Sequence, residues 1–219
     1  MSIYNNKKTL FNKLKRNSKN EWLNYTKHKF LNDLVSNKLS INKFKKYLLQ
    51  DYIFLQQFLR ILSLASYKSK DYADIYKATN FIISIKNELK LHVSFCRKWG
   101  ISFARLNKIK PLKANTAYTD YALKIGSKDT NLELYTCLAP CIIGYGEIGL
   151  NLSKIKNWKK SKYNSWIKMY SSKEYQSVAN DNIRYLDKLF KIEKKRKYKK
   201  LIKIFRKATI LEKKFWDMI

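Results

Sequence analysis

Glycine and proline are scarce in this chain, with five glycines and two prolines among 219 residues. Tight turns and irregular loops depend on these residues, and no run of alternating β-branched residues bounded by turn residues stands out either. We therefore expect an all-α protein with short connections. The length suits one domain over residues 1–219, large enough to bury roughly two-thirds of the surface of the unfolded chain.

Cysteine and long hydrophobic runs are also limited. The three cysteines, Cys96, Cys137 and Cys141, have no companions at zinc-ligand spacing, and their odd number argues against a disulfide scaffold. Apolar runs such as residues 81–85 are far shorter than the ~20 residues of a membrane-spanning helix. The basic residues 1–17 lack the apolar core of a secretory signal, so we expect a cytoplasmic protein with no membrane partner.

Acidic residues are few: 16 Asp and Glu stand against 47 Lys and Arg, which gives a net charge of +31. Such a charge invites a nucleic-acid-binding interpretation. The lysines are nevertheless spread along every segment and accompany abundant Asn, Ile and Tyr, all residues with A/T-rich codons. We attribute the charge to nucleotide composition and expect no specific nucleic-acid partner.

Hydrophobic periodicity and capping residues predict seven or eight helices. Ser40 is a predicted N-cap, Thr130 with Glu133 and Ser171 with Glu174 form capping-box patterns, and Gly100 is a predicted helix end. The predicted helices cover residues 8–34, 40–65, 71–100, 115–126, 130–150, 158–170, 171–190 and 193–219.

One cysteine and two carboxylates lie on faces that otherwise read as buried. Cys141 shares a helical face with Leu138 and Tyr145, so its thiol is expected to point into the core. Asp51 and Glu212 interrupt apolar stripes in two other predicted helices. Because ionisable groups are rarely buried without a partner or a ligand, the three residues suggest a functional site, in which Asp51 stays unpaired until a ligand binds.

Pro140 lies in the middle of the same predicted helix, where it removes a backbone donor and is expected to kink the helix just before Cys141. An inert buried cysteine is the commoner alternative. A catalytic cysteine needs a base or a positive field, and neither His28 nor His92 is an obvious partner. Glu88 and His92 have the spacing of a structural pair or of di-iron ligands, but a second such motif is absent, so we expect no metal site.

Five segments of the chain together resemble the TenA family, the thiaminase II or aminopyrimidine aminohydrolases. The motifs are a tryptophan followed by H-x-F, the tetrapeptide LQDY, N-T-A-Y, the APC segment followed by Y-x-E, and E-x-x-FW. The cysteine in APC is typical of the branch that carries this nucleophile. The matching segments are residues 20–55, 113–123, 138–149, 166–172 and 211–218.

The resemblance implies an all-helical fold like that of haem oxygenase, assembled as a homotetramer with a pocket inside each protomer. It assigns Cys141 as the nucleophile and Glu212 as the acid that exchanges a proton with the pyrimidine ring. Asp51 matches the carboxylate that holds the amino group of the ring. Four further residues match aromatic or hydrogen-bonding positions of the substrate pocket, namely Tyr118, Tyr145, Tyr170 and Phe215.

Phe54 is a departure from the family pattern, which often has a tyrosine three residues after the aspartate. One hydroxyl of the pocket is therefore missing here, and the rate or the substrate preference is expected to differ. Tyr52 is a poor substitute because it lies on a different face of the helix.

The resemblance implies hydrolysis of 4-amino-5-aminomethyl-2-methylpyrimidine to the 5-hydroxymethyl compound in thiamin salvage, with thiamin as a second candidate substrate. No cofactor is expected, because the substrate ring itself accepts the electrons. Two alternatives stay open at this point. One is a non-thiaminase relative on the same fold, either a metal-dependent oxidase or a binding protein, and the other is a basic nucleic-acid-binding protein.

Overall fold

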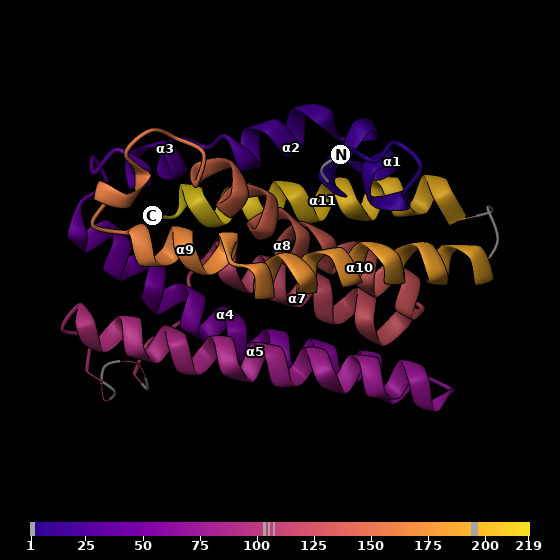
Figure 1. Cartoon of the computed structure of the whole chain (residues 1–219). Coiled ribbons are helices and arrows are strands. Elements are labelled where there is room, and N and C mark those ends of the chain that lie inside the picture. The colour runs from indigo at the N-terminus through magenta and orange to yellow at the C-terminus, as the bar shows by residue number, and fades with distance from the viewer. Residues whose placement is uncertain (1–2, 103, 105, 107, 194–196) are drawn as a thin grey trace. The chain divides into compact units, whose positions relative to one another are not determined.

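The computed structural model describes residues 3–102, 104, 106, 108–193 and 197–219 (Figure 1). Within these ranges all regular structure is helical, as predicted, and no helix is long and apolar enough to cross a membrane. The chain forms two compact units. The first comprises residues 1–39 and 135–217, and the second comprises residues 40–134 with 218–219.

The N-terminal part of the first unit contains a short 3-10 helix and three short α-helices rather than the single helix predicted over 8–34. Thr9 caps the first α-helix, and the ring nitrogen Nδ1 of His28 accepts the backbone N–H of Phe30 and so starts the third. Side-chain caps of this kind compete with a continuous helix, which explains why periodicity alone missed the breaks. The elements are η1 (Ile3–Asn5), α1 (Leu10–Asn17), α2 (Lys19–Thr26) and α3 (Lys29–Val35).

The C-terminal part of the first unit also differs from the predicted boundaries. The segment predicted as one helix over 158–170 is divided into η2 and α9, and Ser172 rather than Ser171 caps α10. The last helix begins at Tyr198; residues 194–196, which the prediction included, lie outside the described part of the chain. The elements are α8 (Asn131–Leu152), whose residues from 135 on belong to this unit, η2 (Trp158–Lys160), α9 (Asn164–Ser171), α10 (Lys173–Ile192) and α11 (Tyr198–Asp217).

Aromatic side chains fix α2 and α3 against α11 in the core of the first unit. The Trp22 and Phe205 rings stack with their centroids 5.5 Å apart, and Phe30 stacks on Trp216 at 4.8 Å. Tyr25 lies parallel to Trp216 at 6.2 Å. Large aromatic rings bury much apolar surface, so these stacks set the position of the helix that carries Glu212.

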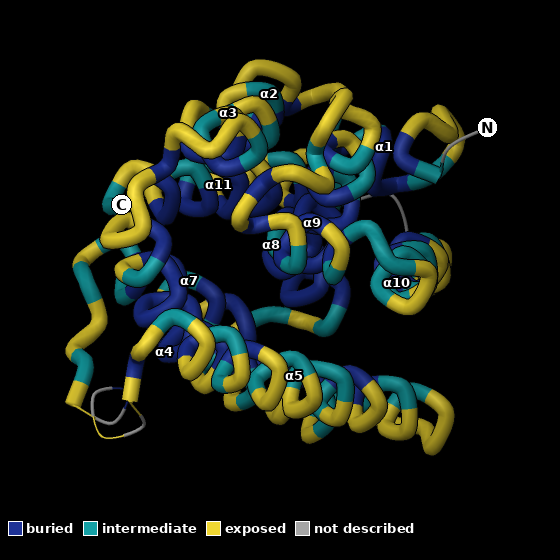
Figure 2. The backbone as a smooth tube through the Cα atoms, turned by 60° about the vertical axis from the view of Figure 1, so that its left-hand side comes forward, coloured by how far each residue is buried: buried dark blue, intermediate teal, exposed yellow. Residues whose placement is uncertain are grey.

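The second unit consists mainly of α4 (Ile41–Lys68), α5 (Tyr72–Lys98) and α7 (Lys113–Lys128). The long helix α4 packs along α5 and against α7, and Figure 2 shows that much more of α4 than of α5 is buried. Ser40 caps α4 as predicted, and α5 ends before Gly100. Gly100 has a φ of 71°, a left-handed conformation that glycine adopts without strain.

Gln50 joins the start of α7 to the middle of α4. Its Nε2 donates to the carbonyl of Lys110, and its Oε1 accepts the backbone N–H of Leu112. The side-chain amide of Asn115 donates to both the backbone and the side-chain oxygen of Gln50. The polar residues of the LQDY and N-T-A-Y motifs thus hold two helices in register.

Candidate active site

Cys141 is half-buried, and the expectation that its thiol points into the core stays a prediction. Its helix α8 is buried on almost every side at this point, from Leu132 to Gly146 with Cys141 as the exception. A helix that is buried nearly all round has no single apolar face, which is why the periodic pattern did not distinguish Cys141 from its neighbours. Cys137, one turn earlier, is fully buried.

Two tyrosines donate hydrogen bonds to backbone carbonyls on either side of Cys141. The Tyr25 hydroxyl donates to the Pro140 carbonyl and the Tyr175 hydroxyl donates to the Ile142 carbonyl, each over 3.2 Å. Gly144 makes room for the first contact, because a Cβ at this position would lie 2.8 Å from the Tyr25 ring. The backbone that carries the thiol is therefore held from α2 and from α10.

Pro140 lies inside α8, as predicted, and provides no N–H for the carbonyl of Thr136. The hydroxyl of Thr136 is buried and has no hydrogen-bond partner among the described residues. Proline thus weakens the helix one turn before the thiol, while the tyrosines hold it from outside. The expected kink itself stays a prediction.

Glu212 is 2% exposed and extends from α11 toward α8. Its effect on Cys137 indicates where it lies. Burial raises the pKa of the Cys137 thiol far above its ordinary value, and the negative charge of Glu212 raises it further. Glu212 therefore acts electrostatically on the residue one turn from Cys141. Because its pKa is raised, Cys137 stays a neutral thiol, and Cys141 is the better candidate for a nucleophile.

The predicted pocket residues of the first unit gather around Trp216. Tyr145 has its ring centroid 4.9 Å from that of Tyr170 and 5.5 Å from that of Trp216. Phe215 contacts the same tryptophan edge-on at 6.3 Å, and Trp166 lies 4.6 Å from Tyr170. These contacts give an aromatic wall next to the helices that carry Cys141 and Glu212.

Asp51, in the second unit, is 4% exposed and has hydrogen-bond partners, so the expectation that it is unpaired is wrong. The Tyr47 hydroxyl donates to its Oδ2 over 3.2 Å, and Nδ1 of His92 lies 3.4 Å from the same oxygen. The other ring nitrogen, Nε2, contacts the Leu48 carbonyl at 2.6 Å. His92 therefore pairs with Asp51 on α4 and not with Glu88, the partner suggested by spacing.

The contacts of His92 leave one proton for the pair it forms with Asp51. The Leu48 carbonyl can only accept, so Nε2 must carry a hydrogen, and the contact of Nδ1 with Oδ2 needs one further proton. Burial raises the pKa of Asp51 to about 7, against the lowering effect of the Tyr47 hydrogen bond. Burial lowers the pKa of His92 to about 4, against the raising effect of the Leu48 carbonyl. Although the geometry matches an ion pair, both shifts favour the uncharged pair, with the proton on Asp51.

Phe54 and Tyr118, the other two predicted residues of the second unit, face each other with ring centroids 5.3 Å apart. Phe54 also stacks on Phe58 at 5.7 Å. The Phe54 ring, at the position where the resemblance leads us to expect a tyrosine, thus continues an aromatic layer on α4.

Comparison with known proteins agrees with this geometry. Residues 16–219 match the model of the TENA/THI-4/PQQC family. The chain belongs to this family. An aminopyrimidine aminohydrolase of Helicobacter pylori is 34% identical over 94% of this chain and 95% of its own length. Another from Halalkalibacterium halodurans is 31% identical over 87% of this chain and 86% of its own.

Solved structures of other proteins show the same fold. A TenA homologue from P. horikoshii superposes with a TM-score of 0.88 at 27% identity, covering 96% of this chain and 97% of its own. A domain of unknown function from Shewanella denitrificans, described as having a heme oxygenase-like fold, superposes at 0.76 with 14% identity, covering 94% of this chain and 90% of its own. The predicted all-α, haem-oxygenase-like fold is thereby confirmed.

Several residues around the site were not predicted from the sequence. Trp166 and Trp216 lie inside the quoted motifs, and their scarcity, with five tryptophans in the chain, was the available signal. Tyr25 and Tyr175 donate hydrogen bonds to backbone carbonyls, and no pattern of side chains predicts such bonds. Among the described residues, no group of three or more His, Cys, Asp or Glu side chains converges as metal ligands would.

Proposed function

We propose that this protein is an aminopyrimidine aminohydrolase that converts 4-amino-5-aminomethyl-2-methylpyrimidine to the 5-hydroxymethyl compound. The carrying observation is the arrangement around Cys141: a half-buried thiol on a helix held by two tyrosines, with the buried Glu212 acting on the preceding turn. The relatives from Helicobacter pylori and Halalkalibacterium halodurans, which cover nearly the same length, bear the name of this activity.

In the proposed reaction the sulfur of Cys141 bonds to a ring carbon as its proton leaves, and Glu212 gives a proton to a ring nitrogen. The electrons of the adduct then break the bond between the exocyclic C5 methylene carbon and its amino group, which takes up the proton lost by the thiol and departs as ammonia. Water adds to the exocyclic carbon. Departure of the sulfur and return of the ring proton to Glu212 restore the aromatic ring.

Asp51 is proposed to bind the substrate as a neutral acid. The edge of a 4-aminopyrimidine presents an N–H donor beside a ring-nitrogen acceptor. The proton of the Asp51–His92 pair lies in the contact between Oδ2 and Nδ1, so the other carboxyl oxygen, Oδ1, is the acceptor for the amino N–H of the ring. Burial, which raises the pKa of Asp51 to about 7, favours the neutral acid.

We place the reaction in thiamin salvage, with thiamin as a second candidate substrate. A putative hydroxymethylpyrimidine/phosphomethylpyrimidine kinase of Schizosaccharomyces pombe contains a segment 33% identical to this chain, which spans 36% of the length of that kinase. A hydrolase that releases the hydroxymethyl compound would supply such a kinase. We further propose a cytoplasmic homotetramer with no specific nucleic-acid or membrane partner.

The test is direct. Purified protein is incubated with the aminomethyl pyrimidine and, separately, with thiamin, and the hydroxymethyl pyrimidine is measured by chromatography. We expect the product from the aminomethyl compound in the presence of a metal chelator. No product from either compound would contradict the proposal, and activity that the chelator abolishes would favour the metal-dependent alternative.

A further inference from the structure

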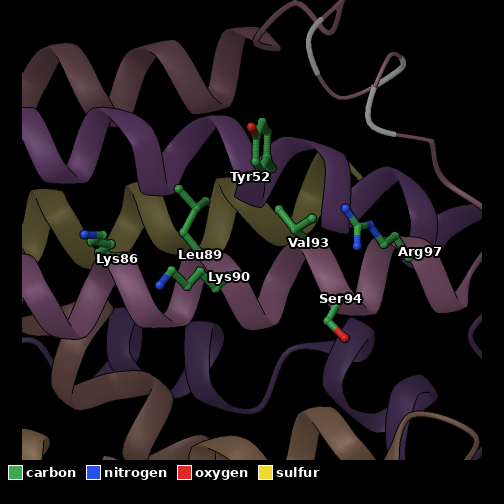
Figure 3. A pocket seen from close by; sticks show the side chains of 7 residues that line it. All are labelled: Tyr52, Lys86, Leu89, Lys90, Val93, Ser94 and Arg97. Carbon is green, nitrogen blue, oxygen red and sulfur yellow. The ribbon is translucent and has the colours of Figure 1, made fainter.

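The groove between α4 and α5 in the second unit is a separate feature, with a volume of about 380 Å³ (Figure 3). That volume lies within the range of small-molecule sites in proteins. Tyr52 comes from α4, and the other lining residues form one stripe of α5, with Lys86 at one end and Arg97 at the other. The lining residues are Tyr52, Lys86, Leu89, Lys90, Val93, Ser94 and Arg97.

The polar groups of the groove are hydrogen-bond donors of positive charge together with one hydroxyl, and no carboxylate lines it. Lys90 and Arg97 lie one helical turn on either side of Ser94, so their side chains are about 5–6 Å from it at the Cβ level. Long basic side chains at this spacing can converge on a single anion above the serine. Three such donors match the terminal oxygens of a phosphate group.

Tyr52 contributes an aromatic ring and a hydroxyl to the groove. Its side chain is 7% exposed, and its hydroxyl has no hydrogen-bond partner among the residues that the structure describes. The hydroxyl oxygen is not among the buried atoms that lack a partner, so it is open to solvent and accessible to a ligand. Together with Leu89 and Val93, the Tyr52 ring gives the middle of the groove an apolar surface.

We propose that this groove binds a small organic phosphate, with its flat ring against Tyr52, Leu89 and Val93 and its phosphate held by Lys90, Ser94 and Arg97. Lysines are common throughout this chain, so positive charge alone would not single out the groove. Its distinguishing features are the Tyr52 ring beside the basic stripe of α5 and the lack of a carboxylate among the lining residues. The site goes beyond the proposed hydrolysis and uses none of the residues assigned to it.

Binding is tested by calorimetry at physiological salt with adenosine 5′-monophosphate, adenosine and inorganic phosphate. The purine avoids competition with a pyrimidine site. We expect the monophosphate to bind at least about tenfold more tightly than adenosine or inorganic phosphate. Only the monophosphate combines the charged hydrogen bonds of its phosphate with the contact of its ring. Equal affinity for inorganic phosphate, or no binding of the monophosphate, would overturn the proposal.

Arg97→Gln and Lys98→Gln form a matched pair, because both residues are exposed cations at the end of α5 but only Arg97 lines the groove. Arg97→Gln should weaken monophosphate binding about tenfold and Lys98→Gln should leave it unchanged. Equal losses in both variants would mean attraction by overall charge and would contradict the site. Tyr52→Phe should weaken binding while the melting temperature stays the same.

Lysine acetylation locates the ligand without a mutation. The monophosphate should protect Lys86 and Lys90 from acetic anhydride and leave Lys98 reactive, as measured by mass spectrometry. Uniform protection, or none, would count against the groove. Hydrolysis of the aminopyrimidine is followed in the same variants and should not change, so failure of this site and failure of the proposed activity are distinguishable.

Discussion

Asp51 in α4 and Cys141 in α8 were both singled out by the hydrophobic pattern, but the structure surrounds them differently. The carboxyl of Asp51 is buried and is contacted directly by the side chains of Tyr47 and His92. The thiol of Cys141 is half-buried, and the tyrosine contacts that fix its helix go to backbone carbonyls.

The difference corresponds to two kinds of preparation for chemistry. At Asp51 the surroundings set the protonation state, because burial raises the pKa of the carboxyl to about 7 and keeps it largely protonated below that pH. At Cys141 the contacts act on the backbone on either side of the residue and set its position. Substitutions at each place should therefore fail in different ways.

The largest effect is expected from Cys141→Ser, which should abolish turnover while substrate binding and the melting temperature stay close to those of the wild type. The change removes a thiolate but little volume. Cys137→Ser is the matched control one turn away, and it should keep the activity if it folds. Near-normal hydrolysis by the Cys141 variant would exclude the covalent mechanism.

Asp51→Asn should weaken binding of the hydroxymethyl product by about tenfold or more, since the amide presents different donors and acceptors to the ring. Because Asp51 also pairs with Tyr47 and His92, we expect a loss of stability of about 1 kcal/mol as well. Calorimetry and urea unfolding separate the two effects. Unchanged affinity with a large loss of stability would make Asp51 a structural residue only.

The shared proton predicts opposite pH dependences for two single variants. The pKa of Asp51 is about 7 in the folded protein, so the folded chain keeps this proton at pH values where the unfolded chain has lost it. The pKa of His92 is about 4 in the folded protein, so the folded chain has lost this proton at pH values where the unfolded chain still holds it. Between these values the two effects on stability cancel in the wild type.

His92→Asn leaves the Asp51 contribution alone, so its stability relative to wild type should fall as the pH rises from about 4 to 7. Asp51→Asn leaves the His92 contribution, so its relative stability should rise with pH up to about 6.5. Each slope is at most about 1.4 kcal/mol per pH unit. Urea unfolding across this range measures both, and parallel profiles would disprove the shared proton.

Tyr25→Phe and Tyr175→Phe test the contacts that flank Cys141. Each removes one hydroxyl and should cost about 1 kcal/mol of stability, with turnover reduced more than substrate binding. Tyr163→Phe removes a similar bond, to the Leu39 carbonyl, and is the control for a purely structural loss. If all three variants lose turnover equally, the flanking contacts have no special role in positioning the thiol.

The smallest effect is expected from Phe54→Tyr, which introduces the hydroxyl that the family resemblance leads us to expect at this position. If that hydroxyl helps to orient the reacting groups, turnover on at least one aminopyrimidine should rise by an amount on the order of 1 kcal/mol in barrier height. Activity on several substrates is compared with the melting temperature, because Phe54 packs against the Tyr118 ring and an added oxygen can disturb that contact. Equal stability with unchanged activity would make the departure at this position irrelevant.

The sequence by itself determined the helical class, the caps at Ser40 and Gly100, and the family. Helix periodicity and capping depend on neighbours three or four residues away, so they are readable locally. The same locality led to errors where a cap competes with helix continuation, as at His28.

Only the tertiary structure decided the exposure of Cys141, the pairing of Asp51 with His92 and the tyrosine contacts to α8. Spacing along one helix favoured Glu88 as the partner of His92, but the ring points to α4, where Asp51 and the Leu48 carbonyl lie. Such contacts join residues far apart in the chain, and bonds to backbone carbonyls leave no trace in residue type. They depend on how helices pack, which side-chain periodicity does not specify.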